Sequence, residues 1–583
     1  MKDKIINSFD IWIGAQGIKS RLRIKNIDNI SLEGIARLRE LILELAVRGK
    51  LVPQDSHEEH ADILLKRITK ERNRLIEEGS IKQGKQFEEI RNDEIPYKLP
   101  EGWAWTRFPT VCNSNVGRTP STKNPLFWSD KPGGIPWVSI SDMIHDGFIL
   151  ETDKYISSKA AKDIFRGQPV SAGTLLMSFK LTVGKISILD IDAFHNEAII
   201  SIYPFKGMNR DYLFKCLPEI ARKGNTKKAI MGNTLNATSL ALLLIPIPPE
   251  KEQHRIVAKV NELMSLCDEL EQQETNHLKS HQLLVETLLG TLTNAADAKE
   301  FQGAWSRLAQ HFDDLFTTED SIDQLKQTIL QLAIMGKLVP QDPKDEPASV
   351  LLGKIEIEKE RLIKENFIKQ EKPLPPISAD EIPYKLPEGW QWCRMKDLCP
   401  NISSGSTPPK IHFKESGIPY LKVYNIRSQK IDFEYQEQFV DEKYHRTKLS
   451  RSILRPGDVI MNIVGPPLGK VAIIPDNYPE WNCNQAITFF QPLEKRMNKW
   501  IYTYLLAGTF LNYIELIGTA GQDNISVTKS KMIMVPLAPI SEQFRIVKKV
   551  DELFALCDRL KEGIGESQKV VNLMANSIVE HCN

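Results

Sequence analysis

Polar and basic side chains gather in short stretches rich in Gly and Pro, at matching places in the two halves of the 583-residue chain. Arg, Asn and Gln can pair bidentately with guanine or adenine, whereas Lys and Ser mainly contact the phosphate backbone. The candidate contact residues are Arg118, Thr119, Lys123, Lys180, Lys185, Lys227, Lys228, Asn233, Ser406, Thr407, Lys410, Arg427, Lys470, Gln522 and Asn524. Taken singly, each fits a solvated loop or turn better, so only the set predicts a nucleic-acid surface.

Two of these lysines lie in matching turns. Lys185 follows Gly184 in GKI, and Lys470 follows Gly469 in GKV, between apolar segments that we expect to be strands. A Gly-Lys turn lets backbone amides approach a phosphate closely while the lysine reaches it. We therefore expect both turns to face the same kind of ligand.

Three motifs resemble catalytic signatures, but each lacks residues that the chemistry requires. NPLF at 124–127 has Leu126 where the amino-methyltransferase loop has a second Pro, and no Gly-rich cofactor loop follows a strand upstream. HEEH at 57–60 spaces its histidines by three residues instead of four. GPPLGKV at 465–471 is one residue short of a P-loop and lacks its Ser or Thr. We expect a loop, a helix start and a hairpin turn here, with no catalytic residue and no metal site.

The candidate residues lie in two bodies of about 150 residues each, rich in Gly, Pro and short β-branched runs. This pattern, with helical stretches near 211–223 and 499–508, predicts mixed α/β bodies with short strands and functional loops. Residues 103–250 hold 17 Lys and Arg against 12 Asp and Glu, and residues 390–541 hold 18 against 13. The whole chain has a net charge of only +1, so positive charge is concentrated in these two bodies. This distribution suits two bodies that approach a polyanion. Ordinary surface variation would also account for it.

Repeated segments frame the two bodies. GKLVPQD occurs at Gly49 and 287 residues later at Gly336, and DEIPYKLPEGW occurs at Asp93 and 287 residues later at Asp380. Charged helices are expected at 61–78 and 348–365 between these markers. Two copies at a constant offset indicate a duplicated unit with pseudo-twofold architecture. The tryptophans that flank each body, Trp103, Trp105, Trp390 and Trp392, are placed identically, which predicts a junction and not base stacking.

Near-identical helical segments close the two halves. EQHRIVAKVNELMSLCDEL at 252–270 and EQFRIVKKVDELFALCDRL at 542–560 share 13 of 19 positions. Apolar residues step by four and three, as in the seam of a coiled coil. The predicted seam residues are Ile256, Val260, Leu263, Cys267, Leu270, Ile546, Val550, Leu553, Cys557 and Leu560. A seam needs a partner helix, and the most economical partner for each segment is its own duplicate.

Composition narrows the class of protein further. A hydrophobic content of 41% in 583 residues predicts an ordered protein with two or more domains. The longest apolar run, 240–247, is too short to cross a bilayer, and the first residues lack a signal-peptide core, so we expect a cytoplasmic location and no membrane partner. Eight cysteines without C-x-x-C spacing argue against disulfides or structural zinc.

The ordered set of motifs resembles the specificity subunit of a type I restriction–modification system. The match rests on the G-x-T-P turns at 117–121 and 405–409, the G-I-P-[WY] strands at 134–137 and 417–420, and GQDNIS at 521–526. The Pro-rich run into E-Q-x-R-I-V at 247–257 and 537–547 completes it. The resemblance covers nearly the whole chain, twice.

The resemblance implies a subunit with no catalytic activity that reads a split, asymmetric target in double-stranded DNA. It implies two docked modification subunits, which are adenine-N6 methyltransferases using S-adenosylmethionine, and further restriction subunits that use ATP and magnesium. No cofactor is implied for this chain. The expected fold is α+β, with two mixed α/β target recognition domains in pseudo-twofold arrangement, separated by an antiparallel coiled coil of two long helices, with extra helical conserved regions.

The expected boundaries follow the markers. They are an N-terminal helical region at 1–102, a first recognition domain at 103–249, a central region with a spacer helix at 250–389, a second recognition domain at 390–540 and a C-terminal spacer helix at 541–583. A helix of about 40 residues is roughly 60 Å long, enough to separate half-sites about 34 Å apart. The alternatives are a two-headed protein-binding adaptor and a self-contained DNA-modifying enzyme.

Overall fold

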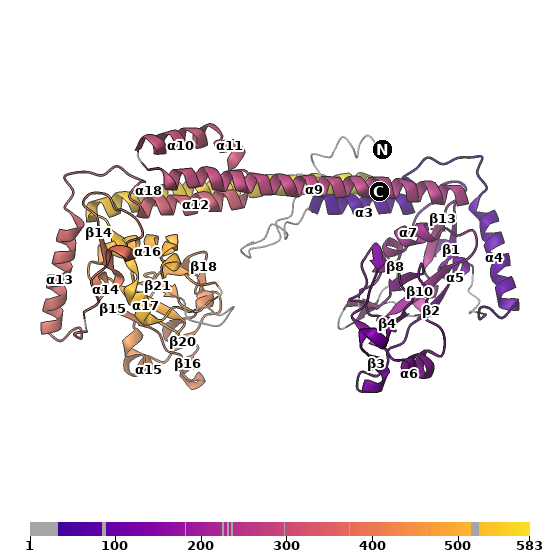
Figure 1. Cartoon of the computed structure of the whole chain (residues 1–583), viewed down its shortest axis with the longest axis horizontal. Helices are drawn as coiled ribbons and strands as arrows, with labels where there is room; N and C mark the ends of the chain where they lie inside the picture. Colours follow the sequence, from indigo (N-terminus) through magenta and orange to yellow (C-terminus); the bar gives the residue numbers. More distant parts are fainter. Residues whose placement is uncertain are drawn as a thin grey trace. The chain divides into compact units, whose positions relative to one another are not determined.

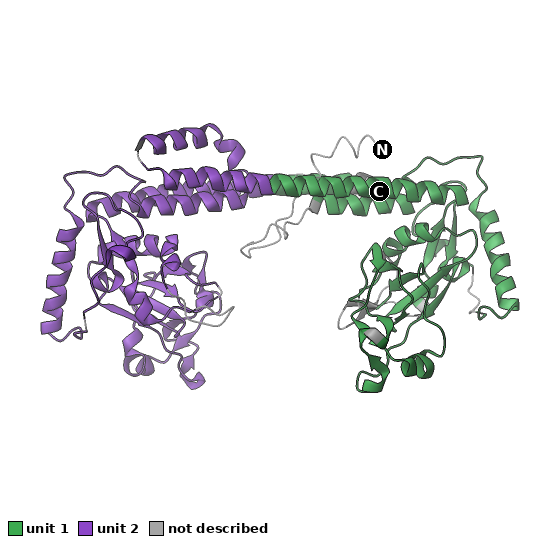
Figure 2. Cartoon of the chain, in the orientation of Figure 1, with its two compact units in different colours: residues 1–278, 568–583 green, residues 279–567 purple. Residues whose placement is uncertain are grey.

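The computed structural model describes residues 33–83, 89–180, 182–223, 227–229, 232–234, 237–296, 298–371, 373–465, 467–514 and 524–582. The chain forms two compact units (Figure 2). Unit 1 comprises residues 1–278 and 568–583, and unit 2 comprises residues 279–567. Among the described residues, no helix combines the length and the apolarity needed to cross a bilayer.

The described part of unit 1 starts at residue 33 with two helices and continues into a body of short strands (Figure 1). Its helices are α3 (Glu33–Val47), α4 (Ala61–Glu77), α5 (Phe108–Val111), α6 (Ser158–Ala160), α7 (Arg210–Lys223), α8 (Ala237–Ala241) and the first part of α9 (Glu250–Asn294). Its strands are β1 (Ala104–Arg107), β2 (Cys112–Val116), β3 (Trp128–Ser129), β4 (Ile135–Val138), β5 (Gly147–Ile149), β6 (Lys154–Ile156), β7 (Leu175–Ser178), β8 (Ile186–Leu189), β9 (Phe194–His195), β10 (Ile199–Pro204), β11 (Lys227–Ala229), β12 (Gly232–Thr234) and β13 (Leu244–Ile247).

The strands of unit 1 form a five-stranded sheet in the order β2-β10-β7-β8-β5 and a four-stranded sheet in the order β3-β6-β4-β9. Strands β7 and β8 are buried at every position, because both faces of the five-stranded sheet are covered and α7 packs against β8. The body closes on itself where β1 pairs with β13, with Ala104 opposite Ile247, immediately before α9.

Unit 2 repeats this plan. Its helices are the end of α9, α10 (Ala298–Gln310), α11 (Phe312–Leu315), α12 (Glu319–Ile334), α13 (Ala348–Lys364), α14 (Met395–Leu398), α15 (Glu442–Thr447), α16 (Asn498–Ala507), α17 (Val527–Met532) and most of α18 (Ile540–Cys582). Its strands are β14 (Gln391–Arg394), β15 (Asn401–Ser404), β16 (Phe413–Lys414), β17 (Ile418–Leu421), β18 (Ile426–Arg427), β19 (Lys430–Ile431), β20 (Phe439–Val440), β21 (Val459–Asn462), β22 (Val471–Ile473), β23 (Asn482–Cys483), β24 (Ile487–Gln491) and β25 (Met534–Leu537).

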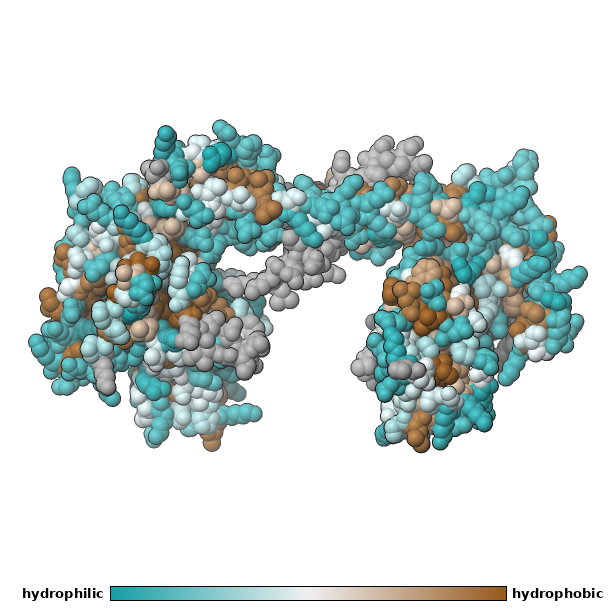
Figure 3. Space-filling model, viewed as in Figure 1, coloured by the Kyte–Doolittle hydropathy of each residue, from teal (hydrophilic) through white to brown (hydrophobic). Residues whose placement is uncertain are grey.

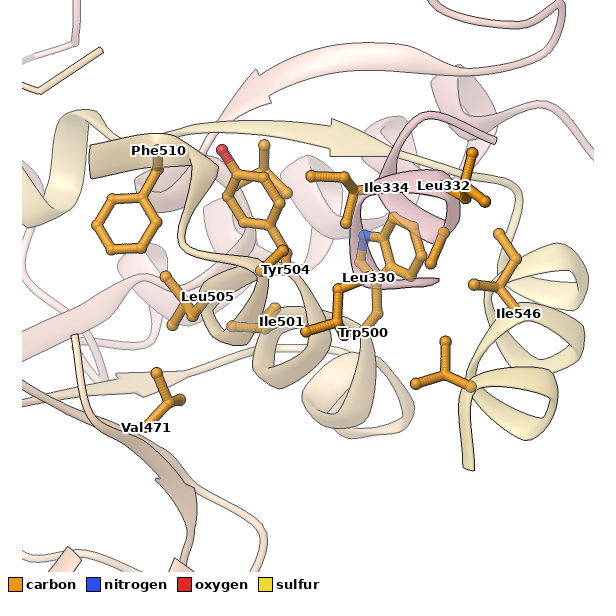
Figure 4. Packing of buried hydrophobic residues seen from close by; sticks show 14 of the residues in the cluster. Leu330, Leu332, Ile334, Val471, Trp500, Ile501, Tyr504, Leu505, Phe510 and Ile546 are labelled. Carbon is orange, nitrogen blue, oxygen red and sulfur yellow. The ribbon is translucent and has the colours of Figure 1, made fainter. Parts of the chain in front are cut away.

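The sheets of unit 2 correspond to those of unit 1. They have the orders β15-β24-β21-β22, β16-β20-β17-β23 and β14-β25. Figure 4 shows Trp500 and Tyr504 of α16 packed beside Ile334 of α12, with Ile546 of α18 nearby. The helices expected in both halves are confirmed, as is the mixed α/β character of both bodies.

The two long helices each contribute to both units. Unit 1 holds the beginning of α9 and the end of α18, whereas unit 2 holds the end of α9 and the beginning of α18, so the helices run antiparallel. In unit 1, Ala575 of α18 is buried in the same core cluster as Ile256 and Val260 of α9. The visible face of α9 is mostly hydrophilic in Figure 3, as expected for a helix whose apolar residues are turned inward.

A second helix also covers each seam, which the sequence analysis did not anticipate. The guanidinium of Arg39 on α3 lies 2.7 Å from Asp268 and 2.9 Å from Glu271 on α9. In unit 2 the ammonium of Lys561 on α18 lies 2.7 Å from Asp323 on α12. Each seam is therefore shared between the far end of the other long helix and a shorter helix from the start of the same half. The expectation that each segment pairs with its own duplicate is wrong, because 252–270 belongs to unit 1 and 542–560 to unit 2.

Nine of the ten predicted seam residues are buried or partly buried, and the prediction for Leu560 is wrong. Leu560 is 39% exposed, whereas Ile564 packs against the core. A straight α-helix drifts relative to a seven-residue repeat, and 18 residues make five turns at about 3.6 residues per turn. Ile564 therefore lies directly below Ile546 on the helix surface, and Leu560 has rotated towards solvent.

The repeated motifs meet in one joint in each unit, built from the same contacts. The indole nitrogen of Trp103 donates to Glu252 at 3.1 Å, and that of Trp390 donates to Glu542 at 2.9 Å. Burial raises the pKa of both carboxyl groups. The junction role of Trp103 and Trp390 is confirmed.

Three further pairs of contacts complete each joint. The side-chain amide of Gln54 donates to Glu252 at 3.2 Å, and that of Gln341 donates to Glu542 at 3.1 Å. Arg255 pairs with Glu58, and Arg545 pairs with Asp345. The indoles of Trp105 and Trp392 donate to the carbonyl oxygens of Tyr97 and Tyr384, both at 3.3 Å. The motifs GKLVPQD, PEGW and E-Q-x-R thus contact one another in each joint. The joint attaches the body of unit 1 to α9 and the body of unit 2 to α18.

Candidate nucleic-acid interface

In unit 2, four strand termini meet at one end of the sheet β15-β24-β21-β22. Because the neighbouring strands are antiparallel, the ends of β15 and β21 lie beside the beginnings of β24 and β22. Three loops leave the sheet at this point, at 405–409, 463–470 and 484–486. The backbone links them, since Gly405 donates to Ile487 O at 3.2 Å and Ile463 donates to Ala486 O at 2.9 Å. This end of the sheet, with its three loops, is called the loop end.

Unit 1 has an equivalent loop end, formed by the loops at 117–124, 179–185 and 196–198. Gly117 donates to Ile199 O at 3.2 Å and Phe179 donates to Ala198 O at 3.0 Å, which reproduces the links of unit 2. The two loop ends bring together candidate residues that lie up to 67 residues apart in the sequence. They are Arg118, Thr119, Lys123, Lys180 and Lys185 in unit 1, and Ser406, Thr407 and Lys470 in unit 2.

Gly117 and Gly405 are glycines because two loops approach each other at these positions. A Cβ at residue 117 would lie 2.0 Å from His195 O, and one at residue 405 would lie 1.9 Å from Cys483 O. The next residues continue the contact, because the backbone nitrogens of Arg118 and Ser406 donate to the same two carbonyl oxygens. The G-x-T-P turn is therefore pinned to the loop that precedes β10 or β24.

This close approach brings each threonine of the G-x-T-P turn onto a polar side chain of the neighbouring loop. The hydroxyl of Thr119 donates to the carboxylate of Glu197, and that of Thr407 donates to the side-chain carbonyl oxygen of Gln485. All four residues are exposed. Glu197 and Gln485 were not among the candidates predicted from the sequence, although they occupy the same place in the matched segments FHNEAIISI and NCNQAITFF.

An aromatic residue of the G-I-P-[WY] strand donates a hydrogen bond to the backbone of each G-x-T-P turn. The indole of Trp137 donates to Arg118 O at 3.0 Å, and the hydroxyl of Tyr420 donates to Ser406 O at 2.9 Å. Two of the motifs that carried the family resemblance, the G-x-T-P turn and the G-I-P-[WY] strand, are thus in direct contact. Both loop ends have the same backbone construction and present different side chains.

The comparison with known families agrees with this duplicated construction. A family model described as a type I restriction modification DNA specificity domain matches residues 100–280 and 387–568. The chain belongs to this type I specificity family. It is 35% identical to the specificity subunit of the type I restriction enzyme EcoAI of Escherichia coli, over 99% of this chain and 98% of that protein.

A second relative and a solved structure complete the comparison. The EcoEI specificity subunit of Escherichia coli is also 35% identical, over 99% of this chain and 98% of that protein. A chain from a structure on complex assembly and conformational transition of a type I R-M system is 18% identical, with a TM-score of 0.47 over 84% of this chain and 99% of that chain.

In this member of the specificity family, both Gly-Lys turns bind the backbone nitrogen of the lysine through a side chain of the preceding strand, Ser178 for Lys185 and Asn462 for Lys470. The ammonium of Lys185 donates to Ile140 O at 3.1 Å, so it is turned towards the protein backbone. The backbone nitrogen of Lys470 donates to the buried side chain of Asn462 at 2.6 Å, and the turn joins the antiparallel strands β21 and β22. The expectation of a hairpin turn in place of a P-loop is confirmed.

Arg427 and Lys410 lie outside the three loops of unit 2. Arg427 belongs to the β18–β19 hairpin, where its guanidinium lies 4.1 Å from the ring centroid of Tyr435 and 3.1 Å from Asp432. Residues of this hairpin still contact the loop end, because the side chain of Gln429 accepts from Val471 N at 2.8 Å. Lys410 is exposed and begins a short 3-10 turn beyond the G-x-T-P loop.

The remaining candidates are placed only in part. Asn524 forms a backbone bridge with Val464, which joins it to the loop end of unit 2. Lys227, Lys228 and Asn233 lie on the paired strands β11 and β12. Gln522 lies outside the described residues. The next residue of GQDNIS lies at the same place, because Ile525 N donates to Ile463 O at 2.9 Å.

Burial governs the ionisation of one histidine at the loop end. His195 supplies the carbonyl oxygen that receives Arg118 N, and its side chain is buried. Burial lowers the pKa of His195 to about 4. Cys483 occupies the same place in unit 2. The imidazole is therefore neutral near pH 7, and the positive charge of this region comes from Arg and Lys.

The other two motifs that resembled catalytic signatures, NPLF and HEEH, form a short turn and the segment just before a helix. The side chain of Asn124 accepts from Leu126 N at 3.2 Å and caps the short 3-10 turn Pro125–Phe127. His60 precedes the first residue of α4. Within the described ranges, no three His, Cys, Asp or Glu residues are grouped so that they could hold a metal ion.

Proposed function

We propose that this chain is the DNA-recognition subunit of a type I restriction–modification complex, and that each loop end reads one half of a split, asymmetric target. The observation that carries the proposal is that the two loop ends share one backbone arrangement and differ in side chains. A shared arrangement suits a shared ligand, double-stranded DNA. Different side chains suit different base sequences, since base edges carry the sequence information.

The repeated joints and helical regions are the proposed docking surfaces for two adenine-N6 methyltransferase subunits. The support is that both joints use equivalent residues in the same contacts, Trp103 with Glu252 and Trp390 with Glu542. Equivalent surfaces suit two copies of one partner. A complex that contains only one methyltransferase per chain at saturation would contradict this assignment.

Catalysis is assigned to the partner subunits. The methyltransferase would use S-adenosylmethionine, and the restriction subunits, which combine motor and nuclease, would use ATP and magnesium. This chain would act as a non-catalytic recognition subunit in the cytoplasm and bind no cofactor itself. Two matches to the DNA specificity family, at 100–280 and 387–568, support this division of labour.

The test is genome-wide mapping of N6-methyladenine in cells that carry this chain with its cognate methyltransferase, compared with cells that carry the methyltransferase alone. We expect a new split motif, with two short asymmetric halves around a fixed gap. The absence of a new motif, with a verified complex present, would favour a two-headed protein-binding adaptor. Such an adaptor would also lack salt-dependent affinity for duplex DNA.

A further inference from the structure

The two loop ends differ in chemistry at one structurally equivalent position. Glu197 in unit 1 and Gln485 in unit 2 each follow an asparagine in the loop before β10 or β24, and each accepts a hydrogen bond from the threonine of the G-x-T-P turn. Both side chains are exposed. The threonine therefore holds the two side chains in the same position, with one oxygen atom engaged.

The atom that remains free is different in the two units. Glu197 retains a second carboxylate oxygen, which can only accept a hydrogen bond. Gln485 retains its NH₂ group, which can only donate. The same scaffold thus presents an acceptor in unit 1 and a donor in unit 2.

A carboxylate at a DNA-facing surface indicates a contact with a base, because the phosphate groups of the DNA backbone repel it. Residues 103–250 carry five more basic than acidic residues, so Glu197 lies in a body that otherwise suits a polyanion. The partners on duplex DNA that favour a carboxylate are the exocyclic amino groups of the bases, above all N4 of cytosine in the major groove. An NH₂ group is favoured instead by the N7 and O6 acceptors of purines or O4 of thymine.

We infer that Glu197 and Gln485 are specificity-determining residues that contact one base pair in each half-site, Glu197 through a base amino group and Gln485 through a base acceptor. The inference rests on the proposed function, because it assumes that the loop ends face DNA. It adds which side chain makes the contact and which chemical group on the base receives it.

A purely structural role for Glu197 makes a different prediction. If the carboxylate only braced the G-x-T-P turn, the substitution Glu197→Gln would be silent, since the amide oxygen still accepts from Thr119. As a base contact, the same substitution replaces an acceptor by a donor and removes a charge. E197Q therefore separates the two roles without removing the brace, and Q485E makes the reverse exchange in unit 2.

The control is Glu151→Gln. Glu151 is exposed and pairs with Lys131 at 3.0 Å. It follows β5, which runs parallel to β8, so it lies beyond the opposite end of the same sheet. E151Q removes the same charge from the same unit without changing the loop end.

The experiment maps N6-methyladenine motifs and measures duplex competition for complexes of the full-length chain with its methyltransferase. We expect E197Q to relax or change one base position in one half-site, with about a tenfold loss of discrimination. Q485E should change one position in the other half-site, and E151Q should change none. Thermal unfolding confirms that each variant is folded.

The possible failures are distinguishable. A wild-type complex that yields a split motif, together with E197Q and Q485E complexes that yield the identical motif, would overturn the inference and leave the proposed function standing. A wild-type complex that yields no split motif would overturn both. Because Q485E lies in the other unit, it gives an independent answer even where E197Q fails to fold.

Discussion

At the scale of single residues, Gly117 and Gly405 determine how close the two main loops of each loop end can come. A methyl group at either position meets a backbone carbonyl oxygen at 2.0 Å or less, and backbone atoms cannot rotate away as a flexible side chain can. The close approach is what aligns Thr119 with Glu197 and Thr407 with Gln485. The glycines therefore fix the position of the loops that we propose to contact DNA.

We predict that Gly117→Ala destabilises unit 1 by about 1–3 kcal/mol, the usual cost of forced overpacking. The same change should weaken recognition of one half-site and leave the other unchanged. Urea unfolding and binding to duplexes that vary one half-site at a time measure the two effects. Gly290→Ala is the control, because no atom outside its own helix lies within 4 Å of the new methyl group. Equal effects of G117A on both half-sites would contradict the prediction.

His195 gives the loop end of unit 1 a dependence on pH. Its folded pKa of about 4 lies below the unfolded value of about 6.5, so the unfolded chain binds the proton more tightly. The contribution of neutral His195 to the free energy of unfolding is fully present above pH 6.5. It is lost as the pH falls from 6.5 towards 4, by a total on the order of 3 kcal/mol.

The matched variant is His195→Cys, which introduces the residue found at the equivalent place in unit 2. We expect the difference between the thermal midpoints at pH 7.5 and pH 5.0 to be smaller in H195C than in the wild-type protein. The same difference in both proteins would show that His195 does not bind a proton on unfolding in this range.

At the scale of elements, each joint contains a buried carboxylate, Glu252 or Glu542, that accepts hydrogen bonds from the uncharged side chains of a Trp and a Gln. Trp103→Phe removes one of the two side-chain donors to Glu252, the other being Gln54. We expect a loss of about 1–3 kcal/mol in unfolding free energy, because a buried acceptor is left without its partner. The loss should shrink at low pH, since burial raises the pKa of Glu252 and a protonated carboxyl group needs fewer donors.

Two substitutions make this measurement specific. Trp390→Phe should have the same effect through Glu542 in unit 2. Trp305→Phe on α10, where the tryptophan is 43% exposed, should have little effect. Denaturant midpoints for the three variants measure the costs. A cost for W305F as large as that for W103F would mean that loss of the ring itself, and not of the hydrogen bond, explains the result.

The seam of α18 offers a second prediction at this scale. Ile546 is fully buried and Leu560 is 39% exposed, although both fit the same four-and-three spacing. We expect Ile546→Ala to cost about 2–5 kcal/mol and Leu560→Ala to cost less than about 0.5 kcal/mol. Equilibrium unfolding of the two variants tests whether the buried face passes through Ile564 or through Leu560.

At the scale of the whole molecule, α9 and α18 each contribute to both units, so we expect their length to affect the gap between the two proposed half-sites. Four residues added after Gln272 in α9, with four added at the facing part of α18, lengthen the pair by about 6 Å, roughly two base-pair steps. We expect methylation mapping to show a longer unread gap and two unchanged half-sites. Altered half-sites with an unchanged gap would contradict the proposed roles of helices and loop ends.

The sequence by itself determined the duplication, the family, the helical regions and the mixed α/β bodies. These follow from local properties: the spacing of apolar residues along 252–270, the Gly and Pro stops in GKLVPQD, and motifs repeated in a constant order. It also gave Arg118, Thr119, Ser406 and Thr407 as candidates, because the G-x-T-P turns stand out from their surroundings. The role of the tryptophans as junction residues could likewise be inferred from identical placement.

Only the tertiary structure decided which of these residues meet. Glu197 and Gln485 reach the G-x-T-P turns through strand pairing between β2 and β10 and between β15 and β24, over 78 residues of sequence that show no local signal of the contact. The ammonium of Lys185 bonds to Ile140 O for the same reason, since a distant loop supplies the acceptor. Leu560 faces solvent because helix rotation accumulates over several turns. Spacing predicts an element and its approximate face, whereas the partners of a side chain depend on contacts between segments that are remote in the chain.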